Sequence, residues 1–228
     1  MLDPSGLPIV LAVADGRFPV GGHAHSSGLE AAHRLDGATT PDDLRAFLHG
    51  RLSTSGVTEA NLIAGIMYRI DLANIDWELI DAEIDARIPN ATLRSTSRLL
   101  GRHWVRAATR VGAGESLGEL LDAVADPHQV AVFALVSRHW NIDPSTAVAI
   151  HLHHLSSSVT GAATRLSGID PYIAQEIHLE QSSYCAEVAR DACSTMAASW
   201  ASIPAPSGPA AEVGAAVHRT LDGRLFRS

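Results

Sequence analysis

Apolar residues recur at helical spacing along most of the chain, and no segment sustains the alternation of apolar and polar residues that marks a half-buried strand. The stretch from Val130 to Trp140 is apolar nearly all round, which predicts a central buried helix. From Pro171 onward an apolar stripe continues over about eight turns and predicts one long helix. Its members are Ile173, Ile177, Tyr184, Val188, Met196 and Trp200.

Helix starts are marked by a capping side chain followed by proline, whose fixed φ suits the first helical position. Such pairs occur at Thr40-Pro41, Asp126-Pro127, Asp143-Pro144 and Asp170-Pro171. Together with the periodicity they predict an all-α fold, a single-domain helical bundle of about ten helices with a C-terminal tail.

The composition changes after Trp200, where Ile203 to Pro209 is rich in proline and reads as a linker. A short helix is expected from about Ala210 to Leu221, ahead of the chain end. We therefore expect a helical domain over residues 1–200, and a linker, short helix and partner-binding tail over residues 201–228.

The charge of the chain excludes several classes of function. The net charge is −8, which disfavours nucleic-acid binding because that affinity rests on neutralising phosphates. All 17 basic residues are arginine, so a P-loop and Schiff-base chemistry both lack their lysine. The N-terminus has no basic leader and no apolar run is long enough for a bilayer. We expect a cytoplasmic protein with no membrane partner.

The stretch from Phe18 to Glu30, F-P-V-G-G-H-A-H-S-S-G-L-E, is the part that composition alone would not predict. Gly21-Gly22 predicts a turn with a positive φ, and Gly28 a point of close packing. The polar cluster at His25, Ser26 and Ser27 would cap a helix from Leu29 to about Leu35. The simplest interpretation is a capped helix start.

Two chemical alternatives stay open for the histidines and serines. Residues 24–28 fit A-x-S-x-G, a relaxed nucleophile elbow in which Ser26 would make the protein a serine hydrolase, although the elbow needs a preceding strand. His23 and His25 could begin a metal site, but only in an extended segment. His151 and His154 would share a helix face and are weak candidates for a helical metal-binding protein.

The glycine-rich stretch resembles the N-terminal signature of the urease accessory protein UreF family, with Phe18 where leucine is usual. Two further segments in the same order are similar to the family: Leu93-Arg94 through Leu99-Leu100-Gly101-Arg102, and the ending Arg224-Leu225-Phe226-Arg227-Ser228. The signature residues of the turn are then Pro19, Gly21, His25, Ser26, Gly28, Leu29 and Glu30.

The second segment lies in an arginine stripe that repeats at every fourth residue: Arg94, Arg98, Arg102, Arg106 and Arg110. Like charges at this spacing repel, so the stripe needs a counter-surface. The preceding segment supplies acidic residues, among them Asp81 and Asp85, and predicts two antiparallel helices that pair acid against base. The alternative is a docking face for an acidic partner, which would use Arg94, Arg98 and Arg102.

The ending combines Leu225 and Phe226 with Arg224 and Arg227 on either side, followed by Ser228. Apolar side chains with charge at the rim favour an anchor for a partner over a tail folded onto its own domain. The resemblance implies a homodimer without catalysis or cofactor of its own. It also implies binding to the UreD/UreH accessory protein, recruitment of the nickel-carrying UreG GTPase, and help in delivering nickel to apo-urease.

Overall fold

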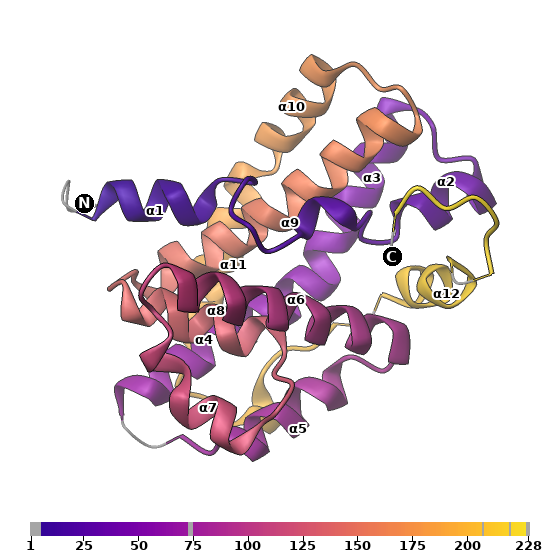
Figure 1. The fold of residues 1–228 in the computed structure, drawn as a ribbon. Helices are drawn as coiled ribbons and strands as arrows, with labels where there is room; N and C mark the ends of the chain where they lie inside the picture. Colours follow the sequence, from indigo (N-terminus) through magenta and orange to yellow (C-terminus); the bar gives the residue numbers. More distant parts are fainter. Residues whose placement is uncertain (1–5, 73–74, 207, 219, 227–228) are drawn as a thin grey trace.

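The computed structural model describes residues 6–72, 75–206, 208–218 and 220–226, and these residues form α-helices and connecting segments without strands (Figure 1). The predicted all-α fold is confirmed. The helices are α1 (Leu7–Ala14), α2 (Leu29–Asp36), α3 (Pro41–Arg51), α4 (Val57–Asp71), α5 (Trp77–Arg87), α6 (Ala91–Arg110), α7 (Gly118–Ala123), α8 (Gln129–His139), α9 (Pro144–Leu166), α10 (Pro171–Glu180), α11 (Ser182–Thr195) and α12 (Pro209–His218).

The core is built around α4, α8 and α9. Helix α4 packs against α8, α9 and α11, and α8 also packs against α6. Every residue of α8 from Val130 to Ser137 is buried, so the predicted central helix is confirmed. Its Phe133 ring meets Trp104 of α6 edge-on, with centroids 5.1 Å apart.

Most of the predicted helix starts are found. Thr40 forms a reciprocal capping box with Asp43, and the side chains of Asp143 and Asp170 cap α9 and α10. The start predicted at Asp126-Pro127 is wrong, because α8 begins at Gln129 with His128 as its N-cap. The Asp126 carboxylate instead accepts two hydrogen bonds from the Arg102 guanidinium, at 2.7 and 2.6 Å.

The single long helix predicted after Pro171 is also wrong. The helix is interrupted at Gln181, between α10 and α11. Ser182 Oγ donates a hydrogen bond to the Leu179 carbonyl there, at 2.6 Å. Such a local bond offers the backbone an alternative to the helical ladder. Helix α10 packs against α3 and α9, whereas α11 packs against α4 and α9. Both halves therefore bury apolar residues at helical spacing, and the stripe alone does not reveal the break.

Helices α3 and α4 are joined by a π-helical turn, η2 (Leu52–Gly56). The hydroxyl groups of Thr54 and Ser55 donate to the carbonyls of Gly50 and Arg51, at 2.7 and 3.1 Å. A Cβ on Gly56 would lie 3.3 Å from Leu152 Cδ2, so this glycine allows α9 to approach closely. The turn widens the helix beside the cavity described below.

The segment after Trp200 returns to the helical body. Trp200 lies in a 3-10 turn, η4 (Trp200–Ser202), and Ile203 is buried. Helix α12 then packs against α2 and α6 (Figure 1). The boundary predicted at residue 200 remains a prediction. Within the described residues, no helix combines the length and apolar character that a membrane crossing requires.

Candidate functional site

The signature turn is shaped by two glycines with left-handed backbone. Gly21 has φ 79° and Gly28 has φ 93°, on either side of a short 3-10 turn, η1 (Gly22–Ala24). The predicted positive φ is confirmed at Gly21, where a Cβ would also lie 2.8 Å from His103 Nδ1. The expected close packing at Gly28 is wrong, since the nearest atom, Phe47 Cζ, would be 3.7 Å away. Glycine is required at position 28 by its backbone angle.

The turn leads into α2, which begins at Leu29 as expected and ends at Asp36. Gly28 itself is the N-cap, in place of the predicted polar residues. Ser26 still takes part, because its Oγ accepts a hydrogen bond from the Glu30 amide at 3.3 Å. Ser26 is fully buried, and no strand precedes it in the described chain. The elbow interpretation therefore lacks both the strand and the exposed hydroxyl it requires.

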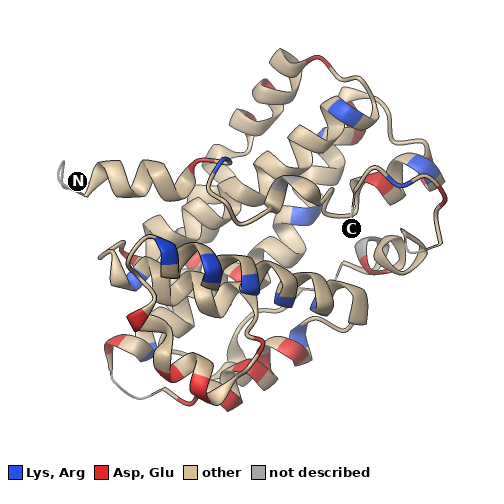
Figure 2. Cartoon of the chain, in the orientation of Figure 1, with Lys and Arg blue, Asp and Glu red and all other residues tan. Residues whose placement is uncertain are grey.

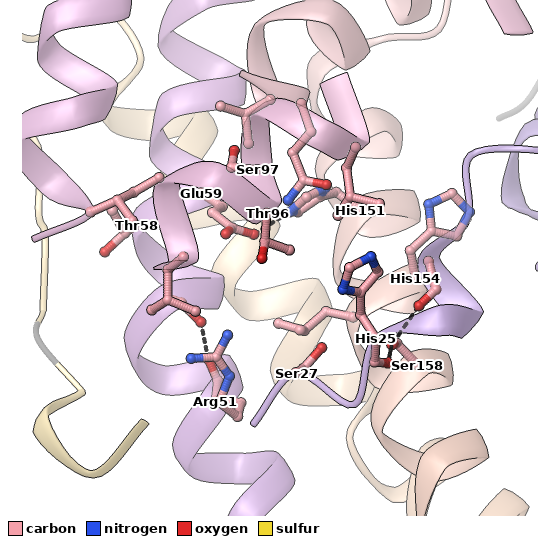
Figure 3. A pocket seen from close by; sticks show the side chains of 18 of the residues that line it. His25, Ser27, Arg51, Thr58, Glu59, Thr96, Ser97, His151, His154 and Ser158 are labelled. Carbon is pink, nitrogen blue, oxygen red and sulfur yellow. Dashed lines mark hydrogen bonds and ion pairs between the residues drawn. The ribbon is translucent and has the colours of Figure 1, made fainter. Parts of the chain in front are cut away.

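Helix α9 holds the turn from the other side. Ser158 Oγ lies 2.7 Å from the carbonyl of His25 and 3.2 Å from that of Gly22, and can donate to either (Figure 3). His25 and Leu29 are buried, whereas Pro19 is exposed. The signature residues consequently serve mainly to fix the backbone in one conformation.

Glu30 is the residue of the signature with the richest set of contacts. Its carboxylate is fully buried and accepts the backbone amides of Leu225 and Phe226, at 2.8 and 3.1 Å. His218 Nε2 lies 2.9 Å away and Arg34 Nη2 3.4 Å away. Burial alone would raise the pKa of Glu30, but these hydrogen bonds hold that pKa below its ordinary value. Glu30 therefore attaches the signature turn to the C-terminal tail of the same chain.

The C-terminal tail is folded onto its own chain. Phe226 is 5% exposed, with the Arg165 guanidinium 4.5 Å from its ring centroid. Arg34 donates to the carbonyls of Asp222 and Gly223, at 2.9 and 2.8 Å. Phe226 is therefore not the free anchor that the sequence suggested. Leu225 is 66% exposed and Arg224 is also exposed, while Arg227 and Ser228 lie outside the described residues.

The motif on α6 is organised around Gly101 and the arginines beside it. A Cβ on Gly101 would lie 2.0 Å from the Pro127 carbonyl oxygen, so only glycine fits. The Arg98 guanidinium pairs with Asp81 and Asp85 of α5, each at 2.9 Å. Arg94 donates to the Ile88 and Pro89 carbonyls and lies 3.9 Å from Asp85.

These contacts agree with the predicted pairing of acidic residues on α5 with arginines on α6. Figure 2 shows the arginines spaced along α6 and acidic residues gathered on α5. Arg98 is only 21% exposed in its side chain, and its charge is engaged within the chain. Arg102, Arg106 and Arg110 are exposed farther along the helix. The docking role expected for Arg94, Arg98 and Arg102 stays a prediction, since Arg94 and Arg98 are engaged within the chain and the exposed Arg102 pairs with Asp126.

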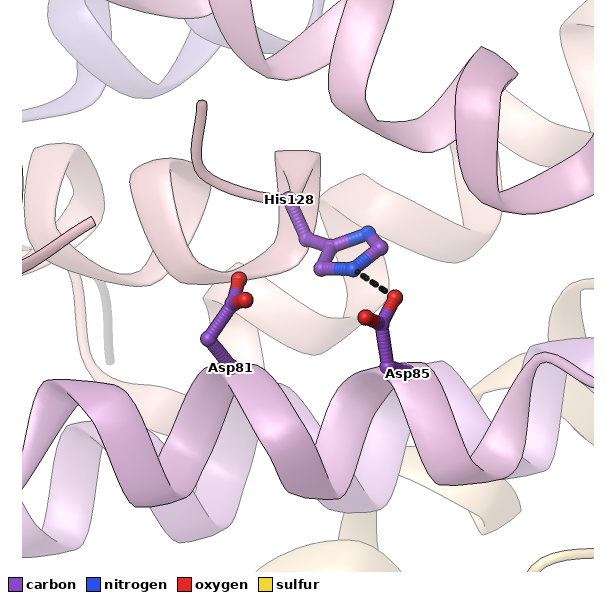
Figure 4. A group of neighbouring side chains, drawn as sticks. All are labelled: Asp81, Asp85 and His128. Atoms are coloured by element: carbon purple, nitrogen blue, oxygen red, sulfur yellow. Dashed lines mark hydrogen bonds and ion pairs between the residues drawn. The ribbon is translucent and has the colours of Figure 1, made fainter. Parts of the chain in front are cut away.

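Asp81, Asp85 and His128 form the one cluster of three possible metal ligands found among the described residues (Figure 4). His128 is completely buried, with Nε2 2.8 Å from Asp85 Oδ1 and Nδ1 3.0 Å from Ser97 Oγ. The Arg98 guanidinium already occupies the cationic position between the two carboxylates. The cluster is thus a satisfied charge network that ties α5, α6 and the start of α8 together.

A cavity of about 520 Å³ lies where the signature turn, the π turn and α9 meet (Figure 3). Two of the segments that carry the resemblance border it, the signature turn and the motif on α6, and α12 also contributes to its wall. Its lining includes Phe18, Val20, Gly22, His25, Ser27, Gly28, Arg51, Thr54, Thr58, Glu59, Leu93, Leu100, Trp104, His151, His154, Ser158, Glu212 and His218.

The two candidate metal ligands on α9 lie in this cavity wall. His151 Nε2 is 2.6 Å from Glu59 Oε2, a partner more than 90 positions away that sequence spacing did not reveal. Burial alone would raise the pKa of Glu59, yet His151 and the charge of Arg51 hold that pKa below its ordinary value. Burial, with His151 and His153 nearby, lowers the pKa of His154 to about 4, so it is neutral at pH 7.

Comparison with known proteins gives consistent matches. The UreF family model matches residues 38–182. The chain is 34% identical over 194 residues to the urease accessory protein UreF of Mycolicibacterium vanbaalenii, covering 85% of this chain and 88% of that protein. It is 32% identical over 194 residues, with the same coverage, to the protein of that name from Mycobacterium tuberculosis strain H37Rv. A third, from Mycobacterium sp. strain JLS, is 34% identical over 166 residues, 72% of this chain and 75% of that protein.

Proposed function

Because the chain belongs to the UreF family of urease accessory proteins, we propose that it bridges the UreD/UreH accessory protein and the UreG GTPase while nickel is delivered to apo-urease. In this proposal it works in the cytoplasm as a homodimer. It contributes binding surfaces and no catalysis or cofactor of its own. The nickel ion is the cargo of the assembly.

One observation carries the proposal beyond family membership: the buried Glu30 carboxylate joins the signature turn to the C-terminal tail. Holding Phe226 inside the fold leaves the neighbouring Leu225 side chain presented outward, at 66% exposure. An exposed apolar residue on a fixed backbone is a suitable contact for a partner, because little conformational freedom is lost on binding. We therefore assign Leu225, with Arg224 beside it, to the surface that meets the accessory partner.

The experiment compares Leu225→Asp with the unchanged chain in pull-downs against UreD/UreH and UreG, and in urease activation in cells that lack their own UreF. The charged side chain is expected to weaken capture of one partner at least tenfold and to lower urease activation. Leu72→Asp is the matched control, because Leu72 is 56% exposed at the end of α4 and far from the tail in sequence. Full capture and activation with Leu225→Asp would exclude this surface.

A further inference from the structure

Buried polar atoms without partners gather at the wall of the cavity. Among the described residues, three side chains that line it carry such atoms: Arg51 at Nε, Arg87 at Nε and His218 at Nδ1. Buried polar groups are nearly always hydrogen-bonded in folded proteins, so each exception asks for an explanation. Arg87 and His218 each make another hydrogen bond, to Glu83 and Glu30. Arg51 does not.

Arg51 is the last residue of α3 and directly precedes the π turn. No hydrogen bond or ion pair involves its guanidinium within the described part of the chain, although the group carries five donors. The acidic residue whose charge acts on it is Glu59, and that carboxylate is hydrogen-bonded to His151 instead. Single π-helical turns within α-helices are frequently found at functional sites.

The other arginines of the lining are engaged, and so is Asp15. Arg87 pairs with Glu83, Asp15 pairs with Arg17, and the Arg165 guanidinium lies over the Phe226 ring. Much of the remaining wall is apolar and includes Leu62, Leu93, Leu100, Trp104 and Val130. The volume of about 520 Å³ falls within the range of small-molecule sites. The cavity thus combines an apolar interior with one uncommitted positive charge.

We propose that this cavity binds a small monocarboxylate with an apolar body, whose carboxylate pairs with the Arg51 guanidinium while its apolar part lies against Leu93, Leu100 and Trp104. A guanidinium and a carboxylate match in a bidentate pair, which can include the buried Nε donor of Arg51. Glu59 and Glu212 in the same wall disfavour a doubly charged phosphate. This site is separate from the partner surface at Leu225.

The test uses octanoate as the probe, in calorimetry and thermal melting of the full chain. Octanol and octylamine provide the same apolar body without the negative charge, and inorganic phosphate provides an anion without the apolar body. Octanoate is expected to bind at least tenfold more tightly than any of the three. Equal binding of octanol, or no octanoate binding at 10 mM, would overturn the proposal and indicate a cavity filled by water alone.

The variant Arg51→Gln keeps much of the side-chain length and removes the charge, so octanoate affinity is expected to fall at least tenfold while octanol affinity stays the same. Arg190→Gln, an exposed arginine outside the lining, is the matched control for general attraction of anions and is expected to bind octanoate normally. Undiminished octanoate binding by Arg51→Gln would also refute the proposal. The comparison of probes on the unchanged chain decides the question if this variant fails to fold.

Discussion

The strongest prediction concerns the contact between Glu30 and the tail. In Glu30→Ala, the buried amide of Phe226 and the part-buried amide of Leu225 lose their acceptor, and a buried unsatisfied group costs about 1–3 kcal/mol. The tail can avoid that cost by detaching. It then gives up the burial of Phe226, about 1.5–3 kcal/mol, and the contact with Arg165, about 0.5–1 kcal/mol. The chain takes the cheaper route, so the free energy of unfolding is expected to fall by about 2–4 kcal/mol.

The assay is a double-mutant cycle in urea, combining Glu30→Ala with deletion of residues 222–228. The contacts of Glu30 predict that the deletion alone lowers stability, whereas a tail that merely awaited a partner would leave it unchanged. Once the tail is gone, Glu30→Ala is expected to cost at least about 2 kcal/mol less than in the full chain. Equal costs in the two backgrounds would refute the idea that Glu30 acts through the tail.

Three further predictions follow from the same structure. Gly101→Ala meets a backbone oxygen and is expected to cost more than about 3 kcal/mol in denaturant melts, whereas the matched change Gly161→Ala, with open space around it in α9, is expected to be neutral or stabilising. Gly28→Ala is expected to cost about 1–2 kcal/mol through its backbone angle alone; a neutral result would contradict the left-handed φ. The free energy of unfolding is expected to decrease as the pH is lowered, in two windows. Below pH 6.5 the unfolded chain protonates His154, whose pKa in the fold is about 4, and below pH 4.5 the unfolded chain protonates Glu30, whose pKa in the fold is lowered. A flat profile in a pH series of urea melts would contradict both expectations.

Local signals in the sequence predicted the local structure well. Proline after a capping residue identified the starts of α3, α9 and α10, because capping and the fixed φ of proline act within one turn. The same signal predicted a helix start at Asp126 wrongly, because the Asp126 carboxylate accepts hydrogen bonds from Arg102 of α6 instead of capping a helix. Periodicity could not show the break at Gln181, since α10 and α11 each bury a stripe of the same spacing.

The candidate site was less accessible to prediction because its contacts join distant parts of the chain. Glu59 and His151 are 92 positions apart, and His128 meets Asp85 across 43 positions. The resemblance pointed to the signature turn, Glu30 included, and to the tail, but not to the hydrogen bonds that join them. Arg51 carried no signal at all, because its significance lies in the partners it lacks within a cavity that only the folded chain forms.

The link between Glu30 and Phe226 has a consequence for how the protein is made. The carboxylate leaves the ribosome 196 residues before the amide that it will accept. Throughout that interval α2 carries an acidic group that cannot be buried favourably, so this corner of the fold must stay open to water until synthesis is nearly finished. The attachment of α2 and α12 to the body is therefore expected to be the last step of folding on the ribosome. A truncated chain that lacks the tail would leave this part of α2 uncovered, and we expect such a chain to be degraded faster by cellular proteases.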